Sequence, residues 1–233
     1  MAPEYNHALI VGAGRGLSAS LARALASDGL KVSLAARNAE KLAGVAEEIG
    51  ATAHTADVAD PGSVSALFDT LDAGGAPDVV VYNPSYRTRG PIIDLDPDEV
   101  LKTLVISAHG GFLVAQQAAK RMLPQSRGAI LFTGASASVK GYAHSAPFAM
   151  GKFALRGLAQ SLARELQPKG IHVAHFVIDG GIQDPSRGRT PPAASPDSML
   201  HPDAIAATYV ATLNQDRTAW STEVELRPWV ERF

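Results

Sequence analysis

Short apolar segments alternate with longer segments of helical periodicity along most of the chain. The short segments predict strands at residues 7–11, 32–36, 51–56, 78–82, 129–133, 171–178 and 224–226. The longer ones predict helices at residues 18–27, 39–49, 98–122 and 148–167, with two more that begin at about residues 61 and 202. Asp60 followed by Pro61 is typical of a helix start, and Gly29 and Gly50 stand where two helices should end.

Most of the predicted strands are apolar at every position rather than at every second one. Strands of this kind are buried on both faces, and strands that alternate with helices form parallel sheets. The sequence therefore predicts an α/β fold, with a doubly wound parallel sheet of about seven strands in a single domain over residues 1–233.

The segment at residues 183–202 has the composition of a linker, because Pro, Ser, Arg and Gly are frequent in it. It follows the sixth predicted strand, so it should lie over the carboxyl ends of the strands, where ligands bind in open α/β sheets. We expect it to be a substrate lid rather than a boundary between domains.

Composition narrows the class of protein. The 233 residues can bury a core without disulfides, and 46% hydrophobic and 19% charged residues are ordinary for a globular domain. A net charge of -2 gives no reason to expect nucleic acid or an anionic membrane as a partner. Cysteine is absent, and neither a signal peptide nor a membrane-length apolar run is visible, so we expect a cytoplasmic protein without a metal site.

A glycine-rich turn links the first predicted strand to the first predicted helix, with the sequence Gly12-Ala13-Gly14-Arg15-Gly16-Leu17-Ser18. Glycine lets a backbone approach a pyrophosphate closely, and the free N–H groups at a helix start attract its charge. Ser18 should add a cap and a hydrogen-bond donor. The turn therefore predicts a nucleotide site, the alternative being a strand-to-helix turn without a ligand.

The end of the second predicted strand indicates which nucleotide is bound. An NAD site usually has an acid there for the ribose 2′-hydroxyl, but this chain has Ala36 followed by Arg37, and Arg15 stands in the glycine turn. Two guanidinium groups without a carboxylate suit a 2′-phosphate. We therefore predict NADP(H), the alternative being two solvated surface arginines.

Further motifs follow the ends of the other predicted strands. They are Asp57-Val58 after the third, Asn83 after the fourth and Gly180 to Ile182 after the sixth, and Lys152 stands on a long helix. With the glycine spacing, they make nearly the whole chain resemble the short-chain dehydrogenase/reductase family. The resemblance implies a Rossmann fold and a cofactor held by Gly12, Gly14, Arg15, Gly16, Leu17, Arg37, Asp57, Val58, Asn83, Lys152, Gly180 and Ile182.

The resemblance also assigns four catalytic positions. In the family a tyrosine gives the proton, a lysine holds the nicotinamide ribose, a serine polarises the carbonyl and an asparagine supports a relay water. On this chain the tyrosine falls at Phe148, the lysine at Lys152, the serine at Ala135 and the asparagine at about Ser107. A phenyl ring has no proton to give, and a general acid is worth about 10²–10⁴-fold in rate, so ordinary ketone reduction needs another donor.

Candidate replacements lie in and before the loop that precedes the helix of Phe148. Tyr142 offers a hydroxyl, His144 offers an imidazole that can act as an acid or a base, and Ser136 stands one residue from the expected serine. Lys152 is a further candidate donor. The alternative for each loop residue is an ordinary place on the surface.

These observations favour an NADP(H)-dependent reductase of a small carbonyl, imine or activated-alkene substrate with a rearranged proton donor. The alternatives are an NADP-binding sensor or pseudo-enzyme without turnover, and a non-redox isomerase or lyase. The resemblance also implies a homodimer or homotetramer built on the helices at 98–122 and 148–167. Trp229 and Phe233 are candidates for a second interface.

Overall fold

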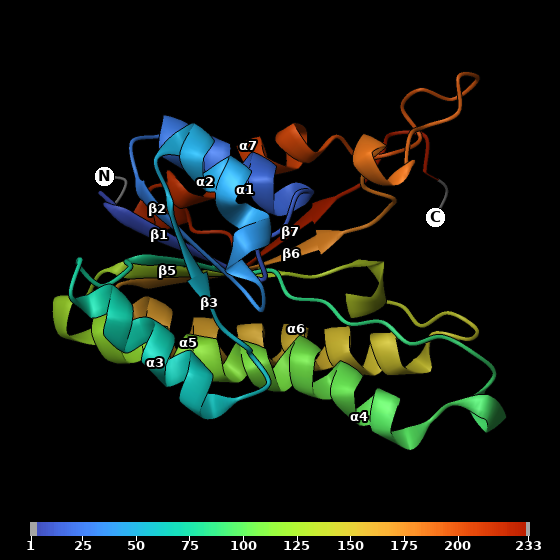
Figure 1. Ribbon diagram of the computed structural model, residues 1–233, viewed down its shortest axis with the longest axis horizontal. Coiled ribbons are helices and arrows are strands. Elements are labelled where there is room, and N and C mark those ends of the chain that lie inside the picture. The colour runs from blue at the N-terminus through green and yellow to red at the C-terminus, as the bar shows by residue number, and fades with distance from the viewer. Residues whose placement is uncertain (1–3, 232–233) are drawn as a thin grey trace.

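The computed structural model describes residues 4–231, which form one seven-stranded parallel sheet between two layers of helices (Figure 1). The strand order is β3-β2-β1-β4-β5-β6-β7. The strands are β1 (His7–Val11), β2 (Lys31–Ala36), β3 (Thr52–Thr55), β4 (Val79–Tyr82), β5 (Gly128–Thr133), β6 (Ile171–Ile178) and β7 (Glu223–Leu226). The predicted doubly wound α/β fold is confirmed.

Helices cover both faces of this sheet. One layer, drawn above the sheet in Figure 1, holds α1 (Leu17–Ser27), α2 (Ala43–Ile49) and α7 (Pro202–Leu213). The other layer holds α3 (Pro61–Asp72), α4 (Pro97–Leu104), α5 (Gly110–Met122) and α6 (Ala146–Leu166). Within residues 4–231, no helix combines the length and the apolar character that a bilayer-spanning helix needs.

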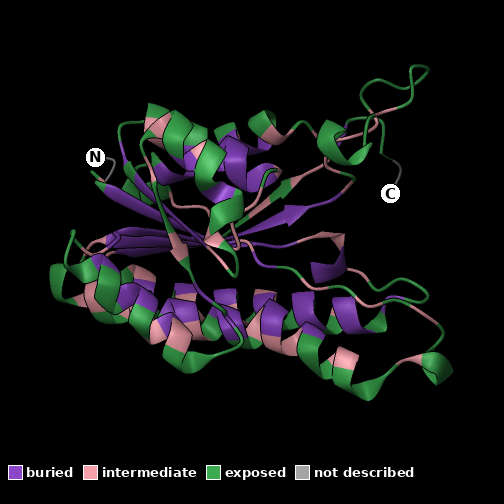
Figure 2. Cartoon of the chain, viewed as in Figure 1, coloured by how far each residue is buried: buried purple, intermediate pink, exposed green. Residues whose placement is uncertain are grey.

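Each inner strand divides its side chains between two cores. On β4, Val80 and Tyr82 join the core on the side of α3, α5 and α6, whereas Val79 and Val81 join the core on the side of α1, α2 and α7. All four are buried, and the strands of the sheet are largely purple, the colour of buried residues, in Figure 2. Because both faces of such a strand are covered, its sequence is a continuous apolar run, which is why the strands could be predicted.

The strand order reverses between β1 and β4, which are neighbours at the centre of the sheet. The chain continues from β1 to strands on one side and from β4 to strands on the other, so the loops at their carboxyl ends diverge. The glycine turn and Asn83 lie at this switch point, where open α/β sheets bind ligands.

The predicted helix at residues 98–122 is interrupted. α4 passes into a π turn (Val105–His109) before α5, and the Gly110 N–H bonds the Val105 carbonyl. The hydroxyl of Tyr82, on β4, donates to the Ile106 carbonyl, which a regular helix would use for that N–H. A side chain of the sheet thus replaces a helical hydrogen bond, which is one recognised cause of a π turn.

Two smaller predictions need correction. Ser18 does not cap α1, because the N-cap residue is Gly16 and the Ser18 hydroxyl donates to the Gly12 carbonyl at 3.3 Å. Residues 39–49 are not one α-helix, because a 3₁₀ turn (Ala39–Leu42) precedes α2. The predicted start of α3 is confirmed, since Asp60 accepts a hydrogen bond from the Gly62 N–H at 2.9 Å.

Candidate active site

The glycine turn after β1 has a shape that requires glycine at its first position. Gly12 has φ +78°, and a Cβ there would lie 2.5 Å from the Pro84 nitrogen. Asn83 Nδ2 donates to Ser18 Oγ at 2.7 Å and so ties the loop after β4 to the start of α1. No side chain caps this helix at Gly16, so its first backbone N–H groups are available to an anion.

Asp184 approaches the same turn from the segment after β6. A Cβ on Gly16 would lie 3.7 Å from Asp184 Oδ2, whereas a Cβ on Gly14 would meet open space. Hydrogen bonds from Ser186 and then from Arg189 lower the pKa of Asp184, so its carboxylate is ionised at neutral pH. A phosphate on the turn would meet this negative charge, which Arg189 offsets. Asp184 is not among the site residues predicted from the sequence.

The two arginines predicted to hold a 2′-phosphate are accessible. Arg37 follows the last residue of β2 and Arg15 lies in the glycine turn, and both are exposed. Among residues 4–231, neither forms a hydrogen bond or an ion pair with a carboxylate. Leu17, in contrast, is buried in the core below α1. Both guanidinium groups can therefore accept a phosphate without first losing a partner.

Asp57 and Val58 already have structural contacts. The Asp57 carboxylate accepts a hydrogen bond from the Ala59 N–H at 3.0 Å. Val58 is buried, and its carbonyl would lie 2.9 Å from a Cβ on Gly110. Their predicted place beside the adenine stays a prediction.

The segment after β6 leaves the sheet and returns to the same place. Ile182 pairs with Leu200, and the Gln183 N–H donates to the Leu200 carbonyl at 2.9 Å. Gly180 has φ +152°, and a Cβ there would lie 2.9 Å from Pro228. The intervening residues, drawn in orange in Figure 1, project beyond the sheet. This shape is compatible with a substrate lid at residues 183–202, and the role of lid stays a prediction.

Lys152 is buried at the carboxyl end of β5. Its side chain is on α6, and its Nζ donates to the Thr133 carbonyl at 2.8 Å. The residue is only 2% exposed. Burial, with a smaller contribution from the charge of Arg87, lowers the pKa of Lys152 to about 8. The ammonium is therefore held at the edge of the sheet where ligands bind, and it loses its proton far more readily than an exposed lysine.

Phe148 lies beside Lys152 on the same helix. The ring is 5% exposed, and Lys152 Nζ lies 5.9 Å from its centre. On the solvent side, the guanidinium carbon of Arg87 lies 4.0 Å from the same ring centre. Arg87 is not among the site residues predicted from the sequence, although it stands only four residues after Asn83, in the loop after β4.

Ser107 faces the same helix from the π turn. A Cβ on Gly151 would lie 2.8 Å from Ser107 Cβ, so only glycine allows this close packing. Ser107 Oγ is buried and has no hydrogen-bond partner among residues 4–231. A buried hydroxyl without a partner is costly, and π turns are frequent at functional sites. Ser107 is thus positioned to bind a water or a ligand next to α6.

The serines after β5 are already engaged in hydrogen bonds. Ser138 Oγ accepts a hydrogen bond from the Ala135 N–H at 3.1 Å. The Ser136 hydroxyl bonds the buried Asp179 carboxylate, to which Lys140 also donates at 3.1 Å. Burial opposes ionisation of Asp179, but these bonds outweigh it and lower its pKa. Ser136 therefore has a structural partner besides its predicted catalytic role.

Tyr142 and His144 lie on the exposed part of the loop before α6. Tyr142 is 48% exposed, and His144 is exposed with φ +60°. Within the described residues, neither side chain forms a hydrogen bond, an ion pair or a ring contact with Phe148 or Lys152. The structure therefore brings Lys152, Phe148 and Arg87 together, but it does not bring the two loop candidates to them.

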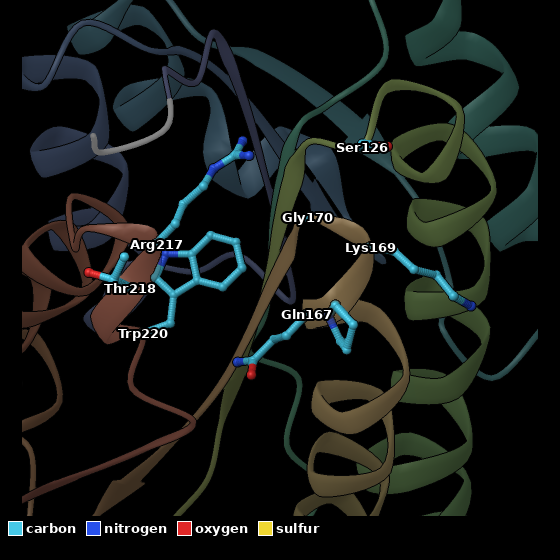
Figure 3. Close-up of a pocket in the computed structure, with 8 residues that line it drawn as sticks. Ser126, Gln167, Lys169, Gly170, Arg217, Thr218 and Trp220 are labelled. Atoms are coloured by element: carbon cyan, nitrogen blue, oxygen red, sulfur yellow. The ribbon is translucent and has the colours of Figure 1, made fainter.

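A separate open cleft lies at the opposite end of the sheet (Figure 3). Its lining includes Ser126, Gly170 and Trp220, which precede β5, β6 and β7. The amino ends of parallel strands lie at the edge away from the glycine turn. The cleft contains none of the predicted site residues, so we do not assign the nucleotide to it.

Two known sequences illustrate the relatives of this chain. The cyclic-di-GMP-binding biofilm dispersal mediator protein of Escherichia coli (strain K12) is 33% identical over 199 residues, which cover 83% of this chain and 78% of that protein. The D-threitol dehydrogenase of Mycolicibacterium smegmatis is 29% identical over 221 residues, which cover 87% of this chain and 84% of that protein.

Solved structures and a family model agree with these matches. A short-chain dehydrogenase from Rhodopseudomonas palustris is 34% identical, with a TM-score of 0.83, and the match covers 97% of this chain and 100% of that one. A metagenomic short-chain oxidoreductase in complex with NADP is 27% identical, with a TM-score of 0.83 over 97% of this chain and 98% of that one. The family model described as short chain dehydrogenase matches residues 6–186. The chain belongs to the short-chain dehydrogenase family.

Proposed function

We propose that the protein is an NADP(H)-dependent reductase of a small carbonyl, imine or activated-alkene compound, in which Lys152 delivers the proton. The observation that carries the proposal is the buried Lys152 ammonium beside the Phe148 ring, at the carboxyl end of β5. Hydride transfer creates negative charge on the substrate, and this charge needs a donor within reach.

The cofactor end of the site supports NADP(H). The uncapped start of α1 and the glycine turn offer backbone N–H groups to a pyrophosphate, and Arg15 and Arg37 are free to bind a 2′-phosphate. Lys152 and Asn83 are the side chains that would face the nicotinamide end. When bound, NADPH supplies the hydride. A relative that is 27% identical was solved with NADP, which supports the same cofactor here.

Lys152 suits the donor role for two reasons. Within residues 4–231, its hydrogen bond to the Thr133 carbonyl uses one of the three protons of an ammonium group. Burial lowers its pKa to about 8, and a general acid works best when its pKa is close to the operating pH. Tyr142 and His144 are the alternative donors, and each would have to move inward from an exposed position.

The test is NADPH oxidation with ketones, enones and imines by the parent and by Lys152→Met, Tyr142→Phe and His144→Ala. We expect Lys152→Met to lower turnover by about 10²-fold or more, and the other two changes to have little effect. Calorimetry with NADPH shows whether Lys152→Met also loses cofactor affinity. Loss of turnover in Tyr142→Phe or His144→Ala instead would move the donor role to that residue. No heat of binding with NADPH or NADP+ would reject the whole proposal.

A second candidate is a nucleotide-binding protein without turnover. It is favoured by Phe148, at the position to which the resemblance assigns the proton-donating tyrosine, and by the 33% identical relative whose name describes cyclic-di-GMP binding. Calorimetry with cyclic di-GMP beside NADPH separates the two candidates. Binding of cyclic di-GMP without NADPH oxidation on any substrate would favour the second.

A further inference from the structure

Arg87 covers the Phe148 ring from the solvent side. Its guanidinium carbon lies 4.0 Å from the ring centre, and the residue itself is exposed. A guanidinium that stacks on a ring keeps its N–H donors in its own plane, where they remain free to bind a planar or tetrahedral oxyanion. The ring therefore orients Arg87 without using its hydrogen bonds.

The loop that carries Arg87 is held on both sides. The Tyr86 hydroxyl donates to the Glu99 carboxylate, on α4. The Gly90 N–H donates to the His144 carbonyl at 3.0 Å, which joins this loop to the one before α6. Arg87 is thus fixed at the mouth of the site rather than left on a free loop.

In the part of the chain that the structure describes, Arg87 has no anionic partner. Other arginines pair with carboxylates: Arg23 with Glu48, Arg121 with Asp72, and Arg156 with Glu223. Among residues 4–231, no hydrogen bond or ion pair is formed by Arg87. Partial desolvation of the guanidinium and then repulsion from Arg89 and Arg189 lower the pKa of Arg87, so the charged groups that affect it are cations.

The Arg87 guanidinium is thus oriented by its neighbours and able to bind an anion, which the substrate can supply. We propose, building on the reductase function above, that Arg87 binds an oxyanion of the substrate, which is therefore a small reducible compound with a carboxylate or phosphate group. Lys152 and Arg87 both lie close to the Phe148 ring, so a compound of a few carbons can reach from one to the other. A charge-assisted pair to arginine also holds the reacting carbon in one orientation.

The experiment compares charged and neutral members of matched pairs: 2-oxo-4-phenylbutanoate with its ethyl ester, and dihydroxyacetone phosphate with dihydroxyacetone. NADPH oxidation gives kcat/KM, and calorimetry on the protein with NADP+ gives the affinity. The variants are Arg87→Met, Arg87→Lys and the control Arg164→Met. Arg164 is an exposed arginine of α6, and among residues 4–231 it donates only to the Gln160 carbonyl.

We expect the parent to favour the charged member of at least one pair by about 10- to 100-fold. Arg87→Met should remove this preference while the neutral member and NADPH bind as before. Arg87→Lys should keep part of the preference for the charged compound, because lysine keeps the positive charge but lacks the planar guanidinium that binds an oxyanion through two hydrogen bonds. Arg164→Met should leave every value unchanged. The pair that shows the preference tells whether the oxyanion is a carboxylate or a phosphate.

Three results would overturn the inference. The first is a parent with no preference for either charged compound. The second is an equal loss with charged and neutral members in Arg87→Met, since Arg87 would then act on the reacting group or only pack on Phe148. The third is a loss of NADPH affinity in Arg87→Met, which would assign Arg87 to the cofactor. Without NADPH oxidation on any compound, the reductase proposal fails, whereas the calorimetric preference still decides on the oxyanion site.

Discussion

Lys152 and Phe148 stand one helical turn apart on α6, and Lys152 Nζ lies 5.9 Å from the centre of the Phe148 ring. A hydroxyl at the tip of that ring would be the proton donor that the phenyl group lacks. This relationship makes Phe148 the most direct probe of the chemistry of the site.

We predict that Phe148→Tyr raises the rate of ketone reduction by about 10²-fold, in the range of a positioned general acid. The reason is that the nearby Lys152 ammonium stabilises a phenolate. The measurement is NADPH oxidation with a simple ketone. The matched control is Phe153→Tyr, since Phe153 is on the same helix but 44% exposed, and it should change nothing. An unchanged rate in Phe148→Tyr would mean that the proton supply is not what limits the parent.

The buried Lys152 should make stability depend on pH. Its pKa is lowered from 10.5 to about 8, so between these values the unfolded chain binds more protons than the folded one, and stability rises with pH. The cost of burying the charge is roughly 3 kcal/mol below pH 8, and it vanishes towards pH 10.5.

The measurement for this prediction is urea unfolding of the parent and of Lys152→Met from pH 7 to pH 10.5. Methionine cannot titrate. From pH 7 to pH 10.5, the free energy of unfolding should therefore rise by roughly 3 kcal/mol more in the parent than in the variant. Other titrating groups cancel in the difference. Two parallel curves would contradict a buried, titrating Lys152.

Gly12 and Gly14 should respond differently to the same methyl group. Gly12→Ala forces a positive φ on alanine and places Cβ 2.5 Å from Pro84, so we expect a loss of about 2 kcal/mol or more in the free energy of unfolding. Gly14 has open space around its Cβ position, so Gly14→Ala should stay within about 0.5 kcal/mol of the parent. Urea unfolding of both variants gives the answer. Similar values would show that the turn can rearrange.

Arg37 should decide between NADPH and NADH. Arg37→Ser should weaken NADPH binding by about tenfold or more and leave NADH binding unchanged, because only NADPH carries the 2′-phosphate. Calorimetry with both cofactors measures this, and Lys120→Ser, an exposed change on α5, is the control. An equal loss for both cofactors would show that Arg37 does not contact that phosphate.

The predicted oligomer is testable on the outer surface of α5 and α6. Phe112 is 43% exposed and Phe153 is 44% exposed, so each helix presents an apolar ring on this surface. Phe153→Asp should shift a dimer or tetramer towards smaller species in sedimentation or light scattering. Trp229→Asp tests the second surface, where Trp229 is exposed and Phe233 lies outside the described residues. A parent that is already monomeric would contradict both interfaces.

Much of the fold was predictable because its signals are local. Asp60 and Pro61 begin α3 through contacts within one turn of the chain, and the strands are apolar because helices cover both faces. The π turn was not predictable, since it depends on the hydroxyl of Tyr82, which reaches the Ile106 carbonyl from another element.

The features of the candidate site also fall into two groups, those that the sequence predicts and those that only the folded structure shows. The sequence alone determined the order of strands and helices, the glycine turn and the place of Lys152 one turn after Phe148, because each depends on neighbours in the chain. Only the tertiary structure decided what surrounds them: Arg87 on the ring, Asp184 beside Gly16, and the burial that shifts the pKa of Lys152. These contacts join loops from different strands, and their energies depend on distance and solvent exclusion, which no local pattern of residues records.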